Sequence, residues 1–173
     1  MSYIIAIDVG IKNLGFVVYD CDDCCVCEWL RVDITNGTKY VPSQNVTYIH
    51  DFVKQHADYF AKAHIVLVER QMRVNMRIIE SVFHSMFYDR CLIIPAQAVK
   101  MHFDISMRNY KLNKRRAVEW VNCHWDTFMP KFVNNLDTWL PIWKKELKQD
   151  DLADSMLMTL YYLNTYSKMS LIS

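Results

Sequence analysis

The chain has 173 residues, of which 52% are hydrophobic and 23% are charged, and its formal net charge is +1. This composition is typical of a globular protein, and it excludes both a disordered chain and a uniformly basic nucleic-acid coat. The early apolar run from Ile4 to Ile7 ends at Asp8, far short of the roughly 18 residues of a membrane span. Because this run also lacks a basic lead-in, we expect no signal peptide and no membrane contact. The length of the chain predicts one domain over residues 1–173.

The beginning of the sequence predicts three short strands. Residues 3–9 form an apolar run rich in β-branched side chains, which is typical of a buried strand. Residues 10–15 supply a turn with a glycine at each end, and residues 14–19 return as a second strand. Residues 26–34 form a third and weaker strand. Together these runs predict an antiparallel meander.

Two amphipathic helices and two buried strands follow. Apolar residues recur at steps of three and four over 46–60 and over 78–87, and Ser43 is the expected N-cap of the first helix. The wholly apolar runs 65–68 and 92–94 are typical of parallel strands that are buried on both faces.

Two further helices are expected over about 114–124 and about 150–166. The order of the elements predicts an α/β fold. Its sheet is mixed, with the antiparallel meander joined by parallel strands, and helices flank it.

The charges are unevenly distributed along the chain. Residues 1–68 carry a net charge of −3, whereas residues 70–116 hold ten Lys or Arg against three Asp or Glu, a net charge of +7. A local excess of this size attracts phosphate chains. The basic segment therefore indicates nucleic-acid binding. The alternative is a solvated surface that the acidic first third balances in space.

Four of the six cysteines, Cys21, Cys24, Cys25 and Cys27, lie within seven residues. Without an export signal, a reducing compartment and free thiols are expected. Cys21 and Cys24 have zinc-knuckle spacing, but no second Cys/His pair follows at the usual interval, and thiolates this close together do not readily surround one ion tetrahedrally. We therefore expect buried or hairpin-tip thiols rather than a structural metal site.

Acidic residues stand at the ends of two of the predicted buried strands. Asp8 ends the first strand, and Glu69 directly follows the apolar run 65–68. A carboxylate at such a place is costly unless it faces solvent, a cation or a metal. Ligands of open α/β sheets bind beyond the carboxyl ends of the strands. The two acids therefore indicate a shared site, with two solvated strand ends as the alternative.

A third acidic feature opens the last predicted helix. Asp151 and Asp154 are three residues apart and share one helix face. The helix dipole explains acids in a first turn, and Asp150 can serve as the N-cap, but Asp154 lies deeper in the helix. Together with Asp8 and Glu69, the two acids suit Mg²⁺, and two such ions can drive phosphodiester hydrolysis. The sequence has no Walker loop and no dinucleotide-binding glycine motif, so no nucleotide cofactor is expected.

Four blocks of this sequence resemble the poxvirus-type Holliday junction resolvases, which are RuvC-like enzymes of the RNase H-like superfamily. The blocks are Ala6–Asn13 (AIDVGIKN), Val66–Gln71 (VLVERQ), Lys114–Trp120 (KRRAVEW) and Lys148–Ser155 (KQDDLADS). They occur in the family's order across nearly the whole chain, and the second and fourth are the most specific. The resemblance implies an RNase H-like fold and a homodimer. Such a dimer nicks two strands of a four-way DNA junction symmetrically with Mg²⁺ or Mn²⁺.

The resemblance also implies roles for individual residues. The family's metal-binding carboxylates, which would hold two ions, fall on Asp8, Glu69, Asp151 and Asp154. The family uses a lysine near the start of the helix before the acidic block, where it would stabilise charge at the scissile phosphate. Lys114 matches that lysine best, while Lys111 and Lys100 remain open. For each of the three, a backbone contact to DNA is the alternative.

The basic segment would then hold the DNA backbone. The candidate DNA contacts are Arg70, Arg73, Arg77, Lys100, Lys111, Arg115 and Arg116. Gln71 is a candidate to orient the substrate. The apolar stripe over 78–87 has more apolar residues than one helix face needs, and by resemblance its helix forms the dimer interface.

The sequence therefore predicts a Mg²⁺-dependent endodeoxyribonuclease that resolves branched DNA during viral genome processing. By the same resemblance it would act inside the infected host cell, at sites of viral DNA replication, and would not be secreted. Two alternatives remain. One is another RNase H-like nuclease that acts on RNA–DNA hybrids or flaps, and the other is a catalytically inactive protein that binds junctions.

Overall fold

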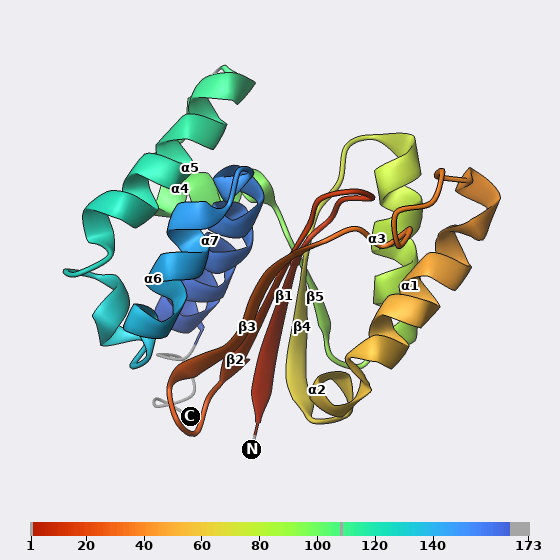
Figure 1. The fold of residues 1–173 in the computed structure, drawn as a ribbon, viewed down its shortest axis with the longest axis horizontal. Helices are drawn as coiled ribbons and strands as arrows, with labels where there is room; N and C mark the ends of the chain where they lie inside the picture. The colour runs from red at the N-terminus through yellow and green to blue at the C-terminus, as the bar shows by residue number, and fades with distance from the viewer. Residues whose placement is uncertain (1, 108, 167–173) are drawn as a thin grey trace.

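The computed structural model describes residues 2–107 and 109–166 of the chain. Its centre is a five-stranded mixed sheet with the strand order β3-β2-β1-β4-β5 (Figure 1). The antiparallel meander consists of β1 (Tyr3–Asp8), β2 (Leu14–Asp20) and β3 (Cys25–Val32). The parallel strands are β4 (Ala63–Glu69), beside β1, and β5 (Cys91–Ile94), beside β4. The predicted α/β fold with a mixed sheet is confirmed.

Helices cover both faces of this sheet (Figure 1). One face carries α1 (Asn45–Gln55), α2 (Ala57–Ala61) and α3 (Val74–Met86). The other carries α4 (Ala96–His102), α5 (Tyr110–His124), α6 (Leu136–Lys145) and α7 (Gln149–Thr165). Alternate side chains of β1 enter separate cores, Ile5 with the first group of helices and Ile4 with the second. Within the described ranges, no helix is both long and apolar enough to cross a membrane.

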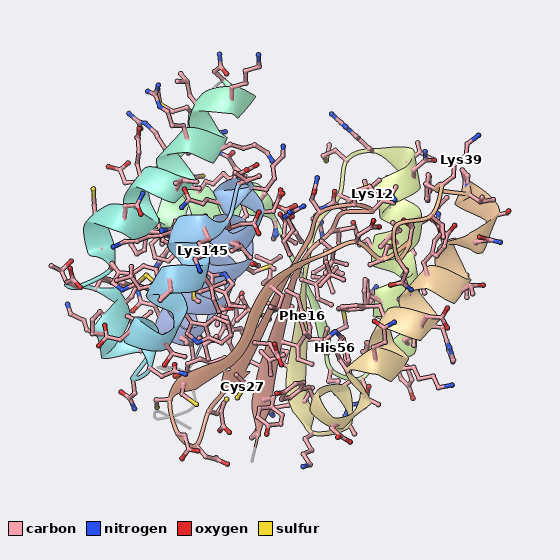
Figure 2. All side chains as sticks on the ribbon, viewed as in Figure 1. Lys12, Phe16, Cys27, Lys39, His56 and Lys145 are labelled. Atoms are coloured by element: carbon pink, nitrogen blue, oxygen red, sulfur yellow. The ribbon has the colours of Figure 1, made fainter. Side chains whose placement is uncertain are left out.

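The helix predicted over 46–60 is in fact two helices. The chain leaves helical geometry at His56, between α1 and α2. The His56 ring lies beside Phe16 (Figure 2), with their ring centroids 4.7 Å apart. The centroid of the Phe52 ring lies 5.0 Å from that of His56. The expected N-cap is wrong. Ser43 belongs to a 3-10 turn, η1 (Pro42–Gln44), and α1 begins after Gln44 without a side-chain cap. Val41 is the N-cap of this turn and Pro42 its first residue, so Ser43 lies inside the turn and cannot cap α1.

Two helices of the second face were not predicted. Short α4 follows Pro95, and α6 contains Pro141, a residue that argues against a helix in a sequence. Packing forms α6 nonetheless, because Trp143 stacks 5.4 Å from Trp29 of β3 in the core. The last helix begins earlier than predicted. Lys148 is the N-cap of α7, so Asp150 lies in the first turn and is not the cap.

The cysteine cluster lies on the hairpin that joins β2 and β3, as expected. Cys21 and Cys24 belong to the turn, Cys25 and Cys27 lie on β3, and all four are free thiols. Burial raises the pKa of Cys21 and of Cys27 to about 11, so both thiols are neutral at physiological pH. Cys27 lies at the opposite end of the sheet from Lys12, which lies near the end of β1 (Figure 2).

Candidate active site

Three elements bring four carboxylates to one end of the sheet. Asp8 is the last residue of β1 and Glu69 the last residue of β4, and these strands run parallel, so both acids lie at the same edge. Asp151 and Asp154 project from the first turns of α7, which packs across β1 and β2. All four side chains line one cavity of about 650 Å³. The structure thus brings together the four acids that the sequence singled out.

Gly15 allows α7 to lie this close to the strands. It pairs with Asp8 across β1 and β2. A Cβ atom at position 15 would lie only 2.3 Å from the backbone oxygen of Asp151 and 3.1 Å from Oγ of Ser155. Any side chain here would push the start of α7 outward, and Asp151 and Asp154 would move away from Asp8.

Burial raises the pKa of three of these acids, Asp8, Asp151 and Asp154. Burial, followed by the negative charges of Glu69 and Asp154, raises the pKa of Asp8 well above its usual range. Burial also raises the pKa of Asp154 to about 7, although Lys100 opposes the shift. The pKa of Asp151 is raised by burial and lowered in turn by Lys114. Such a cluster favours a bound cation, which would compensate the negative charges.

Two lysines enter the same cavity. Lys100 is 8% exposed, and its Nζ lies 3.8 Å from Oδ1 of Asp154. Lys114, in the second turn of α5, pairs with Asp150 and lies 3.4 Å from Oδ1 of Asp151. Lys111 is exposed one turn earlier on α5 and does not line the cavity. Of the three lysines left open by the sequence, the structure therefore places two among the carboxylates.

The donor set fits a hard divalent cation. In the part of the chain that the structure describes, no three Cys, His, Asp or Glu side chains form a ready-made metal cluster, and the lysines pair with the acids instead. However, Oδ2 of Asp151 is buried and has no hydrogen-bond partner among the described residues. Buried polar atoms are normally satisfied, and carboxylate oxygens are the ligands that Mg²⁺ prefers. A cation would satisfy this atom.

Gln71 and Glu80 extend the site toward α3. The Nε2 atom of Gln71 donates to Oε2 of Glu69 at 2.8 Å, and the backbone N–H of Gln71 donates to Oε2 of Glu80 at 2.6 Å. The sequence suggested that Gln71 orients the substrate, and Glu80 was not predicted. No local signal points to Glu80, since it lies nine residues from Gln71 and the two meet only when α3 packs on the sheet.

The candidate DNA contacts surround the cavity unevenly. Arg70 and Arg73 line its rim and are exposed. Arg77 lies one turn further along α3 and lines the groove between α1 and α3 instead of the carboxylate cavity. On α5, Arg115 is exposed and pairs with Glu119 at 3.1 Å, and Arg116 is half-buried. The structure therefore does not bring all the candidate arginines to one place.

Lys12 also lines the carboxylate cavity and was missed, although it belongs to the first sequence block. Its amine donates to Oδ2 of Asp33 at 3.1 Å and to the backbone oxygen of Thr38 at 2.7 Å. These contacts fix the loop after β3 against the β1–β2 turn. The charge of Lys12 thereby stays beside the cavity that it lines.

A second groove, of about 690 Å³, lies between α1 and α3. Its apolar lining comes from Val46, Val74, Ile78, Val82 and Met86. The apolar stripe predicted over 78–87 therefore divides between two faces: Ile79 and Phe83 are fully buried in the core, whereas Ile78 remains 43% exposed. This division explains why the stripe holds more apolar residues than one face needs.

Comparisons with known proteins agree with this architecture. The Poxvirus A22 protein family matches residues 2–165 of the chain. A crystal structure of the fowlpox virus resolvase with its substrate Holliday junction DNA is 17% identical, with a TM-score of 0.64 over 94% of this chain and 97% of that one. The yeast mitochondrial Holliday junction resolvase Ydc2 is 22% identical, with a TM-score of 0.74 over 98% of this chain and 82% of that one.

A third solved structure, RuvC of Thermus thermophilus, is 15% identical, with a TM-score of 0.56 over 97% of this chain and 96% of that one. A search of curated proteins finds no match. At these identities the solved structures establish the fold, and they confirm the RuvC-like, RNase H-like architecture that the sequence predicted.

Proposed function

The chain belongs to the Poxvirus A22 protein family, and we propose that it is an endonuclease that resolves four-way DNA junctions during viral genome processing. The observation that carries the proposal is the convergence of Asp8, Glu69, Asp151 and Asp154 on one cavity. The similarity in fold to a viral resolvase solved with Holliday junction DNA supports the choice of substrate. We take residues 1–173 as a single nuclease domain. We place its action at sites of viral DNA replication in the infected cell.

The four carboxylates would hold two Mg²⁺ ions, with Mn²⁺ as a substitute. When bound, such ions activate water and stabilise the leaving oxygen of a phosphodiester. The acids that line the cavity can serve as ligands only when ionised. Since burial raises the pKa of Asp8 well above its usual range and that of Asp154 to about 7, ion binding would be accompanied by proton release.

The two cavity lysines would have different tasks. The Lys114 side chain is 29% exposed, against 11% for Lys100, so Lys114 can reach a phosphate that lies across the cavity mouth. We assign Lys114 to stabilise the charge that develops at the scissile phosphate. Lys100 lies deeper, and we assign it to offset the charge of Asp154.

The DNA backbone would cross the cavity between the β4–α3 connection and α5. Arg70 and Arg73 stand on the first side. On the second side, α5 carries Lys111, Arg115 and Arg116 in addition to Lys114. Arg77 lines the groove between α1 and α3, and there it would contact DNA that passes beside the interface between two copies of the chain. Phosphate contacts of this kind position DNA without reading its sequence.

Paired cuts require two active sites, and the chain supplies one set of carboxylates. We propose that two copies associate through the groove between α1 and α3. Its apolar residues, Val74 and Ile78 among them, are exposed to solvent in the monomer, with 75% and 43% of their surface accessible. An exposed apolar patch of this kind marks an interaction surface.

Cleavage of a four-way junction labelled on each of its four strands tests the function. We expect symmetric paired nicks in Mg²⁺, and we expect none for Asp8→Asn or Asp151→Asn. Faster cleavage of an RNA–DNA hybrid or a flap would favour another RNase H-like nuclease. Tight junction binding without cleavage in Mg²⁺ or Mn²⁺ would favour an inactive binding protein. Robust cleavage by both variants would exclude the proposed site.

A further inference from the structure

The side chain of Gln71 holds the Glu69 carboxylate. Its Nε2 atom donates to Oε2 of Glu69 at 2.8 Å and lies 3.3 Å from the backbone oxygen of the same residue. Both partners are acceptors, so the nitrogen of the amide must face Glu69. The donor of the Gln71 side chain is therefore occupied within the protein before any substrate arrives.

Gln71 is in turn held by Glu80. Oε2 of Glu80 accepts the backbone N–H of Gln71 at 2.6 Å, a short bond to a charged acceptor in a part-buried place. The preceding residue is also fixed, because the N–H of Arg70 donates to the backbone oxygen of Ile94 at 2.8 Å. The connection between β4 and α3 is thus tied to β5 on one side and to α3 on the other.

Helix α3 is a firm support for this contact. Ile79, next to Glu80, and Phe83, three residues further, are fully buried in the core. Glu80 therefore projects from a helix that cannot rotate without exposing both side chains. The chain of contacts from a packed helix through Glu80 and Gln71 ends on a carboxylate of the cavity.

We infer that Gln71 and Glu80 are positioning residues that hold Glu69 in the orientation in which it binds a divalent cation. The inference rests on the proposed function, because it assumes that the carboxylates bind metal. Hydrogen bonds to the ligands of a metal site fix their orientation, and losing one typically weakens metal affinity or activity by about 10- to 100-fold. This positioning role for Gln71 replaces the interpretation, drawn from the sequence, that Gln71 orients the substrate.

Mn²⁺ binding in the absence of DNA distinguishes the two interpretations. We expect Gln71→Leu, which keeps the side-chain size but removes the donor, to bind Mn²⁺ about 10- to 100-fold more weakly than the wild type by titration calorimetry. Gln44→Leu is the matched control, because the Oε1 atom of Gln44 accepts a hydrogen bond from the Tyr48 hydroxyl at 2.8 Å and Gln44 does not line the cavity. The control should bind Mn²⁺ like the wild type.

Glu80 variants test the second contact. Glu80→Gln keeps an oxygen that can accept the Gln71 N–H, whereas Glu80→Leu keeps none. We expect Mn²⁺ affinity to fall in the order wild type, Glu80→Gln, Glu80→Leu. Thermal unfolding of the metal-free variants shows whether each remains folded, and because Glu80 and Gln71 are altered separately, loss of one variant leaves the other to decide.

Unchanged Mn²⁺ affinity in Gln71→Leu, with or without reduced junction cleavage, would overturn the inference, since a substrate contact affects only cleavage. A wild type that binds no Mn²⁺ would overturn it too. A wild type that binds Mn²⁺ but cuts no junction would contradict the proposed function alone. In that case weaker Mn²⁺ binding by Gln71→Leu would still support the role of Gln71.

Discussion

Gly15 of β2 lies so close to Asp151 of α7 that a methyl group at position 15 would come within 2.3 Å of the Asp151 backbone oxygen. The backbone of one strand therefore sets the distance between the acids of α7 and Asp8. Because the clash would be with backbone rather than with a flexible side chain, it can be relieved only by shifting α7 and β2 apart.

Gly15→Ala should therefore weaken metal binding as well as stability. Overpacking of this kind costs about 1–3 kcal/mol of unfolding free energy, measurable by urea denaturation, and displacement of α7 should lower Mn²⁺ affinity at least about tenfold. Gly37→Ala is the control. Gly37 has a φ of +79° with nothing within 4 Å of an added Cβ, so alanine there costs stability through backbone strain alone. If both variants bound Mn²⁺ equally well, the spacing role of Gly15 would be refuted.

Lys114→Met should slow the chemical step. In the wild type, the Nζ atom of Lys114 lies 3.4 Å from Oδ1 of Asp151, and Lys114 lines the cavity. Removing one preorganised charge from a reaction site typically lowers the rate by about 10²- to 10³-fold. Single-turnover cleavage with saturating enzyme measures this step.

Lys111→Met is the comparison for Lys114→Met, because Lys111 is exposed outside the cavity. It should weaken junction binding and reduce the salt dependence of affinity by about one phosphate contact. Its saturated cleavage rate should change much less than that of Lys114→Met. The reverse pattern would favour Lys111 over Lys114 for the proposed catalytic role.

Asp33→Asn should reduce stability at neutral pH and flatten the acid dependence of unfolding. Burial opposes ionisation of Asp33, but hydrogen bonds from Thr35, Lys12 and Gly37 outweigh it and hold its pKa at about 2. The folded-state pKa is lower than the unfolded value of about 4. The stabilisation is therefore complete above pH 4 or so and is lost as the pH falls toward 2.

Urea denaturation of the wild type and Asp33→Asn at several pH values measures this effect. The Asp33 side chain is 33% exposed, so the difference at pH 7 should be no more than about 1 kcal/mol. We expect the two curves to converge as the pH approaches 2. A constant difference at every pH would show that the Asp33 charge contributes nothing.

Ile78→Glu should separate the two copies of the proposed dimer. The Ile78 side chain is 43% exposed and lines the groove between α1 and α3, and a buried charge without a partner is strongly unfavourable in an interface. Light scattering should show a dimer for the wild type and a monomer for the variant. Paired nicks should become single, independent ones.

Met101→Glu is the control for Ile78→Glu, because Met101 is 65% exposed on α4, on the other face of the sheet. It should remain dimeric. A wild type that is monomeric at micromolar concentration, or a dimer that persists in Ile78→Glu, would rule out this interface.

The predictions from sequence succeeded where a local pattern reflects burial. The strands that end at Asp8 and Glu69 were visible because each is apolar until the acid, and the position of both acids at one edge follows from parallel pairing. The helix α6 was not visible, because Pro141 argues against it and its formation depends on tertiary packing, including that of Trp139 and Trp143 on Trp29.

Contacts between distant segments could not be predicted in the same way. Nothing in the local sequence distinguishes the expected burial of Lys100 from that of Lys114. Their different depths in the cavity depend on how α4 and α5 pack against α7. The contact between Glu80 and Gln71 depends on the docking of α3. Such relationships are set by the tertiary arrangement, so no local periodicity reports them.

The ion pairs of Lys100 with Asp154 and of Lys114 with Asp151 have a practical consequence. Because the lysine ammonium groups partly neutralise the carboxylates, we expect this end of the sheet to stay folded without a metal. A chelator should therefore stop cleavage reversibly without unfolding the protein. An enzyme arrested in this way could be loaded onto an intact junction and started synchronously by adding the ion.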